Sequence, residues 1–271
     1  MSGESPMEAG TEHRRIAVMG GVYSNWAALE ATLEDMRRRD VDAVFCLGDM
    51  GGFGPHPDRV FPLLREGGVH CIQGNYDQSL ASGRTDCGCG YTDPRDNHYA
   101  LVSYQYTFRN TSTENKAWLG SLPVRRRVKL GPYRLLMCHG SPRVVNEFLW
   151  ESSTPNGLIQ SFLDTHDTDV ILCTHTGIKW HRALARDRHL VNVGVIGRPE
   201  NDGTPRVWYT LLTAEAGLEV EFVPLAYDHE GLARAMDAEG LPLEFAETIR
   251  TGWWTTCLEN LPARERSRGR F

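Results

Sequence analysis

Short apolar runs separated by polar turns dominate the first part of the chain. Three runs have the length and composition of buried strands, and the residues between the first two repeat apolar positions at helical spacing. Ser24 or Asn25 precedes that helical stretch and can cap it. The pattern predicts strands at 15–19, 41–47 and 69–73, with a helix after Asn25 and a shorter helix at 57–65. This alternation of strand and helix is typical of a parallel α/β unit.

The second half of the chain has a different pattern of apolar and polar residues. Two runs, 124–130 and 133–138, are separated only by Gly131-Pro132, which predicts an antiparallel pair. Further short strands are predicted near Val170, Ala183, Leu190, Val207 and Leu218, and the chain from 227 onward is mostly helical. The sequence therefore predicts an α/β fold in which the later strands form a mixed or antiparallel sheet.

A polar segment without clear periodicity interrupts these elements at 78–98. It follows a strand directly, contains the pair Cys87 and Cys89, and is predicted to be a cap loop over a pocket. The predicted organisation is a disordered N-terminus (1–13), a main domain (14–227) that carries this cap loop, packed C-terminal helices (228–262) and a solvated tail (263–271).

Four apolar runs end in a side chain that can bind a metal ion. These side chains are Asp49, Asn75, His139 and His175. Because ligand sites of α/β sheets lie beyond the carboxyl ends of the strands, we expect the four to meet at one site. The alternative is that they persist only as hydrogen-bonded core residues.

Composition narrows the functional classes. The chain has 271 residues, a formal net charge of -6 and seven cysteines. This balance argues against a protein that binds nucleic acid as a scaffold, and no apolar run is long enough for a membrane span. The first thirteen residues lack the apolar core of a signal peptide, and four cysteines lie inside strand patterns as small hydrophobes, so a cytoplasmic location is expected.

The order of the motifs resembles the calcineurin-like metallophosphoesterase family, in particular its small bacterial members. The family pattern runs Asp-x-His, Gly-Asp, Gly-Asn-His-Asp/Glu, His-Gly and Gly-His-x-His. Here Gly48-Asp49, Gly74-Asn75, His139-Gly140 and His175 match it in order, from about Arg15 to Gly252. The resemblance implies a sandwich of two facing mixed β-sheets flanked by helices.

The resemblance also implies which residues would act. One metal ion of the family's pair would be held by Asp49, Asn75, His139 and His175, with Asp49 also serving catalysis. The positions that hold the other ion are Gly21, Tyr23 and Gly177, and none is an ordinary replacement, although Tyr23 could bind a ferric ion. The histidine that assists the leaving group is replaced by Tyr76.

The expected function is therefore a metal-dependent phosphoesterase-like hydrolase of phosphomonoesters or phosphodiesters, including nucleotides, with one Mn, Fe or Zn ion per chain. Tyr76, Asn25 and Arg198 are expected to contact a small phosphorylated substrate, and a homo-oligomer is compatible with the sequence. One alternative is an inactive metal- or nucleotide-binding protein on the same fold.

A second alternative is a repurposed metalloenzyme. In that case Cys87 and Cys89 would supply a thiolate to the vacant half of the site as extra ligands. The simpler interpretation is a Gly-rich loop with two free thiols.

Overall fold

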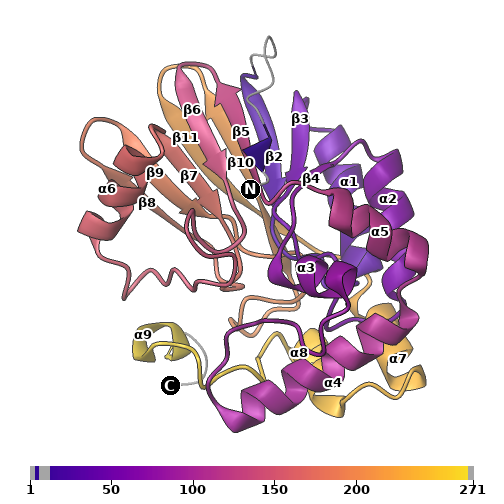
Figure 1. Cartoon of the computed structure of the whole chain (residues 1–271). Coiled ribbons are helices and arrows are strands. Elements are labelled where there is room, and N and C mark those ends of the chain that lie inside the picture. Colours follow the sequence, from indigo (N-terminus) through magenta and orange to yellow (C-terminus); the bar gives the residue numbers. More distant parts are fainter. Residues whose placement is uncertain (1–3, 6–12, 268–271) are drawn as a thin grey trace.

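Two β-sheets face each other and helices cover their outer surfaces (Figure 1). The computed structural model describes residues 4–5 and 13–267. One sheet has six strands in the order β1-β5-β6-β7-β9-β8, and the other has five in the order β11-β10-β2-β3-β4. Both sheets mix parallel and antiparallel pairs, which confirms the predicted sandwich.

The five-stranded sheet is built mainly from the start of the chain. Its strands are β2 (Arg15–Met19), β3 (Ala43–Cys46), β4 (His70–Cys71), β10 (Val207–Ala214) and β11 (Leu218–Leu225). The first three are parallel, as predicted, and β10 is antiparallel to β2. The helices α1 (Trp26–Arg37) and α2 (Val60–Glu66), with the 3-10 turn η1 (Pro57–Arg59), lie on its outer side (Figure 1).

The six-stranded sheet comes from the middle of the chain. Its strands are β1 (Glu4–Ser5), β5 (Arg125–Leu130), β6 (Tyr133–Met137), β7 (Val170–Cys173), β8 (Trp180–Leu184) and β9 (Arg188–Asn192). The predicted antiparallel pair is β5 and β6, and α6 (Asn156–Thr165) covers the outer face.

Alternating side chains of each strand fill two different cores. In β2, Ile16 and Val18 pack between the sheets with residues such as Leu135 and Val170. Ala17 and Met19 point the other way, into the core beneath α1 and α2. Since both faces of β2 are buried, its uninterrupted apolar run is explained.

Three helices and the C-terminal segment gather at one end of the sheets (Figure 1). These are α4 (Pro94–Asn110), α7 (His229–Ala238) and α8 (Leu243–Thr251), while α3 (Asn75–Ser82) and α5 (Thr113–Ser121) link β4 to β5. Apolar residues of α7 and α8 pack with Phe53 and Tyr106 of the main domain. The helices α7 and α8 therefore pack on the main domain.

Three predicted boundaries differ from the structure. The cap loop is shorter than 78–98, because α3 extends to Ser82 and α4 begins at Pro94, where Asp93 caps two backbone N–H groups. Near the C-terminus, α9 (Ala263–Arg266) is not a solvated tail: Glu265 is buried and accepts hydrogen bonds from Ser152.

Most of the predicted disordered segment 1–13 lies outside the described residues, but Glu4–Ser5 pairs with β5 and His13 with Leu130. Residues 268–271 of the predicted tail also lie outside the described residues.

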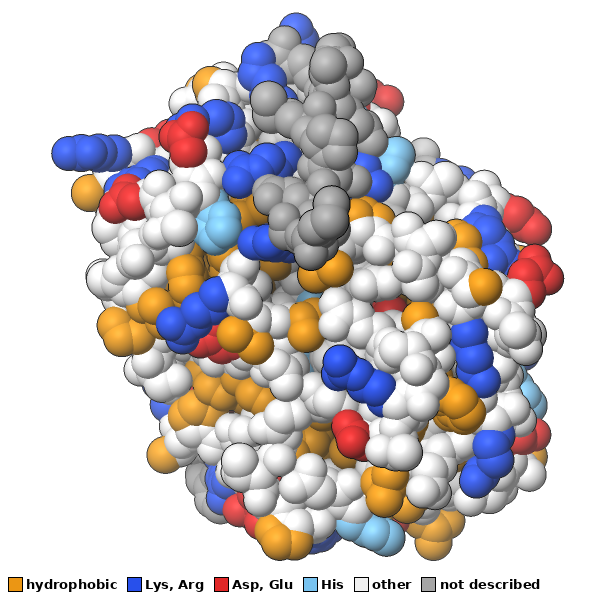
Figure 2. All heavy atoms as spheres, viewed as in Figure 1, with side chains coloured by type: hydrophobic (Ala, Val, Ile, Leu, Met, Phe, Trp, Pro, Cys, Tyr) orange, Lys and Arg blue, Asp and Glu red, His pale blue; other side chains and the backbone are white. Residues whose placement is uncertain are grey.

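Within 4–5 and 13–267, no helix combines the length and the apolar character that a bilayer crossing requires. On the face shown in Figure 2, Lys, Arg, Asp and Glu side chains are scattered among hydrophobic and other side chains, and several Lys and Arg side chains gather in the upper part of the view.

Candidate metal centre

The four predicted ligand residues come from loops at the ends of four strands. Asp49 follows β3, Asn75 begins α3 after β4, His139 follows β6 and His175 follows β7. All four side chains are buried. Ligand atoms of Asp49, His139 and His175 lie within 4.8 Å of one another, and this is a group that could hold a metal ion. The prediction that strand ends from both sheets converge is confirmed for these three residues.

Acceptor atoms face one another at this point. The Nδ1 atom of His139 lies 2.7 Å from the carbonyl oxygen of Leu47, so Nδ1 carries a proton and donates it there. The other ring nitrogen, Nε2, lies 3.1 Å from Oδ2 of Asp49 and 3.1 Å from Nδ1 of His175. A bare Nε2 would repel the carboxylate oxygen at this distance. A positive centre, either a proton on His139 or a metal ion, therefore has to sit between them.

Two further buried polar atoms at the site have no partner among the described residues. Asn75 donates through Nδ2 to the carbonyl oxygen of Cys87 at 2.9 Å, which fixes its amide, while its Oδ1 accepts nothing. The Nε2 atom of His175 is also unpaired. Because an unpaired buried polar atom costs about 1–3 kcal/mol, two of them beside a carboxylate fit the donor set of a divalent metal.

The pKa shifts agree with this donor set. Burial and the neighbouring His139 lower the pKa of His175 to about 3, so this imidazole is neutral. Burial tends to raise the pKa of Asp49, but the two histidines and the Tyr76 N–H outweigh it and the pKa is lowered. Burial opposes protonation of His139, and the Asp49 carboxylate nevertheless raises its pKa. A metal ion would compete with that proton.

Asp77 positions the loop that carries Asp49. Its carboxylate accepts backbone N–H groups from Asp49 at 2.7 Å, Gly74 at 2.8 Å and Met50 at 3.1 Å. Burial and Asp49 raise the pKa of Asp77 to about 7, against the lowering effect of the three N–H donors. Gly74 must be glycine because a Cβ there would lie 2.1 Å from Oδ1 of Asp49.

The backbone at two ligand residues lies in the left-handed region. Asp49 has φ 57° and His175 has φ 68°. Non-glycine residues with such values are uncommon and cluster at functional sites. The local turn aims both side chains at the centre.

Other side chains of this protein occupy the space next to the positions that hold the second metal ion in the family. A Cβ on Gly21 would lie 2.4 Å from the ring of Tyr23, and a Cβ on Gly177 would lie 3.1 Å from Trp254. Tyr23 was expected to be an extra ligand, and the structure instead places its ring over Gly21. Burial raises the pKa of Tyr23 well above its usual value, so its hydroxyl stays protonated.

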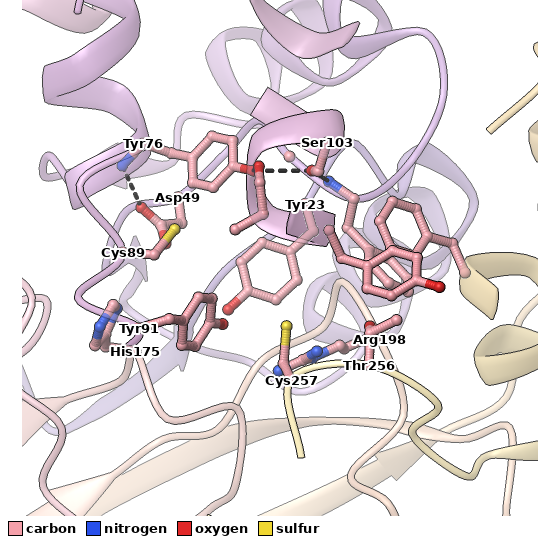
Figure 3. Close-up of a pocket in the computed structure, with 15 residues that line it drawn as sticks. Tyr23, Asp49, Tyr76, Cys89, Tyr91, Ser103, His175, Arg198, Thr256 and Cys257 are labelled. Atoms are coloured by element: carbon pink, nitrogen blue, oxygen red, sulfur yellow. Dashed lines mark hydrogen bonds between the residues drawn. The ribbon is translucent and has the colours of Figure 1, made fainter. Parts of the chain in front are cut away.

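One pocket joins the retained ligands to the expected substrate contacts (Figure 3). Asp49, His175, Tyr76 and Arg198 line it, and Figure 3 shows Arg198 beyond the ring of Tyr23. The other lining residues of the described chain are mostly aromatic or small: Tyr23, Gly52, Phe53, Cys89, Tyr91, Tyr99, Ala100, Ser103, Phe245, Thr256 and Cys257.

Two expected contacts have structural roles. Asn25 does not line the pocket: it caps α1 through Oδ1, and its Nδ2 donates to the carbonyl oxygen of Gly197 at 3.1 Å. Both ends of its amide are used, so the expected substrate contact of Asn25 is wrong. The Tyr76 hydroxyl hydrogen-bonds Ser103 at 2.8 Å, and burial raises its pKa further above 10.

Cys87 and Cys89 are joined by a disulfide. The expected free thiols are therefore absent in this state, and neither sulfur is a thiolate ligand. The physical reason lies in the loop: Gly88 has φ 61°, a conformation that bends the chain so that the two flanking side chains approach. The loop still reaches the site, since Asn75 donates to Cys87 and lies 3.6 Å from Sγ of Cys89.

Sequence reasoning missed several pocket residues. Tyr91, Thr256 and Cys257 line the pocket but belong to no sequence motif. No signal in the sequence relates these residues to the site.

Comparisons with known proteins show the family and agree with the fold. The model of the calcineurin-like phosphoesterase superfamily domain matches residues 15–217. The protein MJ0912 of Methanocaldococcus jannaschii, described as uncharacterized, is 26% identical over 251 residues, which are 88% of this chain and 98% of that protein.

Two solved structures resemble the chain over nearly its full length. A metallophosphoesterase from Sphaerobacter thermophilus has a TM-score of 0.69 and 25% identity, covering 89% of this chain and 100% of its own. The hypothetical protein PH1004 from Pyrococcus horikoshii OT3 has a TM-score of 0.75 and 21% identity, covering 89% and 99%, and it supports the fold alone.

Proposed function

This chain belongs to the calcineurin-like phosphoesterase superfamily, and we propose that it is a phosphoester hydrolase that works with one divalent metal ion per chain. The family and the Asp49, His139 and His175 group together indicate a metal-dependent phosphoesterase. The number of ions and the substrate are our proposal. The single observation that carries it is the convergence of Asp49, His139 and His175 in one buried place, next to the unpaired Oδ1 of Asn75.

The retained residues suit Mn, Fe or Zn. Two imidazoles, a carboxylate and an amide oxygen are ligands that these ions accept, and such a set leaves positions for water or substrate. When bound, the ion would supply Lewis acidity toward a phosphoryl oxygen and lower the pKa of a water molecule. Asp77 would hold the Asp49 loop, and the Leu47 carbonyl would hold the ring of His139, in the geometry that binding needs.

The leaving group receives little help from this chain. Tyr76 occupies the position of the family's assisting histidine, but its hydroxyl is bonded to Ser103 and its pKa is raised by burial. A phenol whose pKa lies so far above neutrality is a poor general acid for a departing alkoxide. We therefore propose that the enzyme prefers small phosphoesters whose leaving groups need no protonation, such as aryl esters.

The decisive experiment combines metal content with turnover. Protein purified without added metal or affinity tag should contain about one equivalent of a divalent ion, since only one ligand set remains. It should also hydrolyse p-nitrophenyl phosphate or its diester. Both should disappear in His139→Ala and persist in His181→Ala. His181 also contacts a second imidazole, His189, at 3.0 Å, but outside the pocket.

Other outcomes would favour the alternatives. Metal without turnover, over a range of aryl phosphates, would support a non-catalytic metal- or nucleotide-binding protein. No metal, even after Mn²⁺, Fe²⁺ or Zn²⁺ is supplied, would contradict the proposed site. The expected cytoplasmic location, the homo-oligomer and the absence of nucleic-acid scaffold binding stay predictions.

A further inference from the structure

The space beside the retained ligands holds a cation of the protein itself. A Cβ on Gly177 would lie 3.1 and 3.2 Å from Cη2 and Cζ2 of Trp254 and 3.3 Å from Nη2 of Arg198. Gly177 stands where the family pattern has the last histidine of the second metal position. The guanidinium of Arg198 therefore lies in contact with the place where that ligand's side chain would begin.

Arg198 is buried in an unusual way for a charged residue. Its side chain belongs to a residue that is 7% exposed, and its guanidinium carbon lies 3.6 Å from the centre of the Trp254 ring. Trp254 is itself fixed, because its indole N–H donates to the carbonyl oxygen of Pro199 at 2.7 Å. The stack holds the guanidinium in the pocket.

Arg198 has no carboxylate partner among the described residues. Every ion pair found in that part of the chain involves other residues, and Nε of Arg198 has no hydrogen-bond acceptor there. Its nearby partners are the Cys257 thiol and the rings of Tyr23 and Tyr91. A buried cation without a counter-ion is costly, so a bound anion would stabilise it.

We propose that Arg198 replaces the second metal ion and binds the non-bridging oxygens of a phosphoryl group, which selects dianionic phosphomonoesters. This inference rests on the proposed function, since it places the other end of the phosphoryl group on the metal held by Asp49, His139 and His175. The planar fork of arginine fits two phosphoryl oxygens at once.

Charge balance in the pocket favours the monoester. Among the described lining residues, Asp49 is the only carboxylate and Arg198 the only Lys or Arg side chain. A divalent ion and Arg198 contribute three positive charges, and Asp49 removes one, leaving two. A phosphomonoester dianion matches this value, whereas a phosphodiester carries a single negative charge.

Binding of inorganic phosphate to the metal-loaded protein tests the proposal. Arg198→Met should weaken phosphate binding by about thirtyfold or more, because a buried charge-assisted contact is lost, and should leave the metal content unchanged. The matched control is Arg59→Met, which removes another arginine stacked on a tryptophan, 3.4 Å from the Trp26 ring and outside the pocket. Calorimetry with inorganic phosphate gives the affinities, and elemental analysis gives the metal content.

Substrate preference provides a second readout that a structural role would not move. The wild-type protein should favour p-nitrophenyl phosphate over bis(p-nitrophenyl) phosphate in kcat/KM, and Arg198→Met should reduce that ratio by about tenfold or more. Arg198→Lys, which keeps the charge but not the fork, should fall between them. If Arg198→Met does not fold, the ratio in Arg198→Lys is compared with the wild-type ratio, and a decrease is expected.

The proposal is overturned if folded, metal-loaded Arg198→Met binds phosphate like the wild-type protein, or if neither variant changes the monoester preference. A requirement for two metal equivalents would overturn it as well. If the wild-type protein binds no metal or shows no turnover, the proposed function is contradicted instead. Failure of the proposed function can therefore be told apart from failure of this inference.

Discussion

Two histidine pairs in this structure show what makes a metal centre. Nε2 of His139 lies 3.1 Å from Nδ1 of His175, and Nε2 of His181 lies 3.0 Å from Nδ1 of His189. In the first pair Nε2 of His139, Nδ1 of His175 and Oδ2 of Asp49 meet in one buried place. In the second pair, His189 uses its other nitrogen for the exposed Asp187 at 3.0 Å, so the three groups form a chain and share no centre. Convergence, and not the residue types, separates a metal site from a hydrogen-bonded network.

The largest expected effect follows from removing a converging ligand. His139→Ala should lower metal affinity and kcat/KM by more than about a hundredfold, since even groups behind the ligands are worth about ten- to a hundredfold. His181→Ala should change neither by more than about twofold. Elemental analysis and aryl phosphate turnover measure both variants. Equal losses in the two would mean that the pairs are not different after all.

The support behind the ligands should matter next. Asp77→Asn should weaken metal binding by about ten- to a hundredfold, because the Asp49 loop loses a carboxylate that accepts three N–H groups. Asp42→Asn is the matched control, since Asp42 accepts the N–H groups of Arg14 and Arg15 away from the site. Metal titration monitors each variant. An unchanged affinity in folded Asp77→Asn would show that the loop keeps its shape alone.

Restoring the family's ligands for the second metal ion should not create a second metal site, for steric reasons. Gly21→Asp, Tyr23→His and Gly177→His together should destabilise the protein by about 1–3 kcal/mol and still bind one ion, because Trp254 and Arg198 occupy the space. Gly240→His is the control for the backbone, with φ 66° and open space around it.

Adding Trp254→Gly to the triple variant should allow a second ion to bind. Thermal unfolding and metal content report the result. Two ions in the triple variant alone would refute the steric account.

The smallest effect is expected for the disulfide. Cys87→Ser with Cys89→Ser should keep the metal content and change metal affinity by less than about tenfold, because Asn75 is held by the backbone carbonyl of residue 87. Wild-type protein treated with a thiol reductant should have the same metal content and affinity as this double variant. Loss of metal in the double variant would support the alternative that Cys87 or Cys89 is a metal ligand.

The convergence of Asp49, His139 and His175 could be predicted from the sequence, for a physical reason. Apolar runs that end in a polar residue fix where the side chain emerges, and the parallel strands β3 and β4 carry Asp49 and Asn75 to the same edge of the sheet. The main strands and the antiparallel pair β5 and β6 were predicted from the same periodicity.

The other half could not be predicted in this way. Trp254 reaches Gly177 across 77 positions of the chain, and no local pattern encodes such a contact. Asn25 was misassigned because a cap and a substrate contact use the same side-chain chemistry. The Cys87–Cys89 bond depends on the turn at Gly88, which the segment's lack of periodicity concealed.

The left-handed backbone at Asp49 and His175 sets a limit on engineering. Each such residue costs about 1–3 kcal/mol that glycine would not incur. Selection for heat resistance alone would thus favour replacing Asp49 and His175, the residues that we propose as metal ligands, as expected when stability and activity trade off. Substitutions meant to raise the thermal stability of this protein should therefore be made outside these two turns.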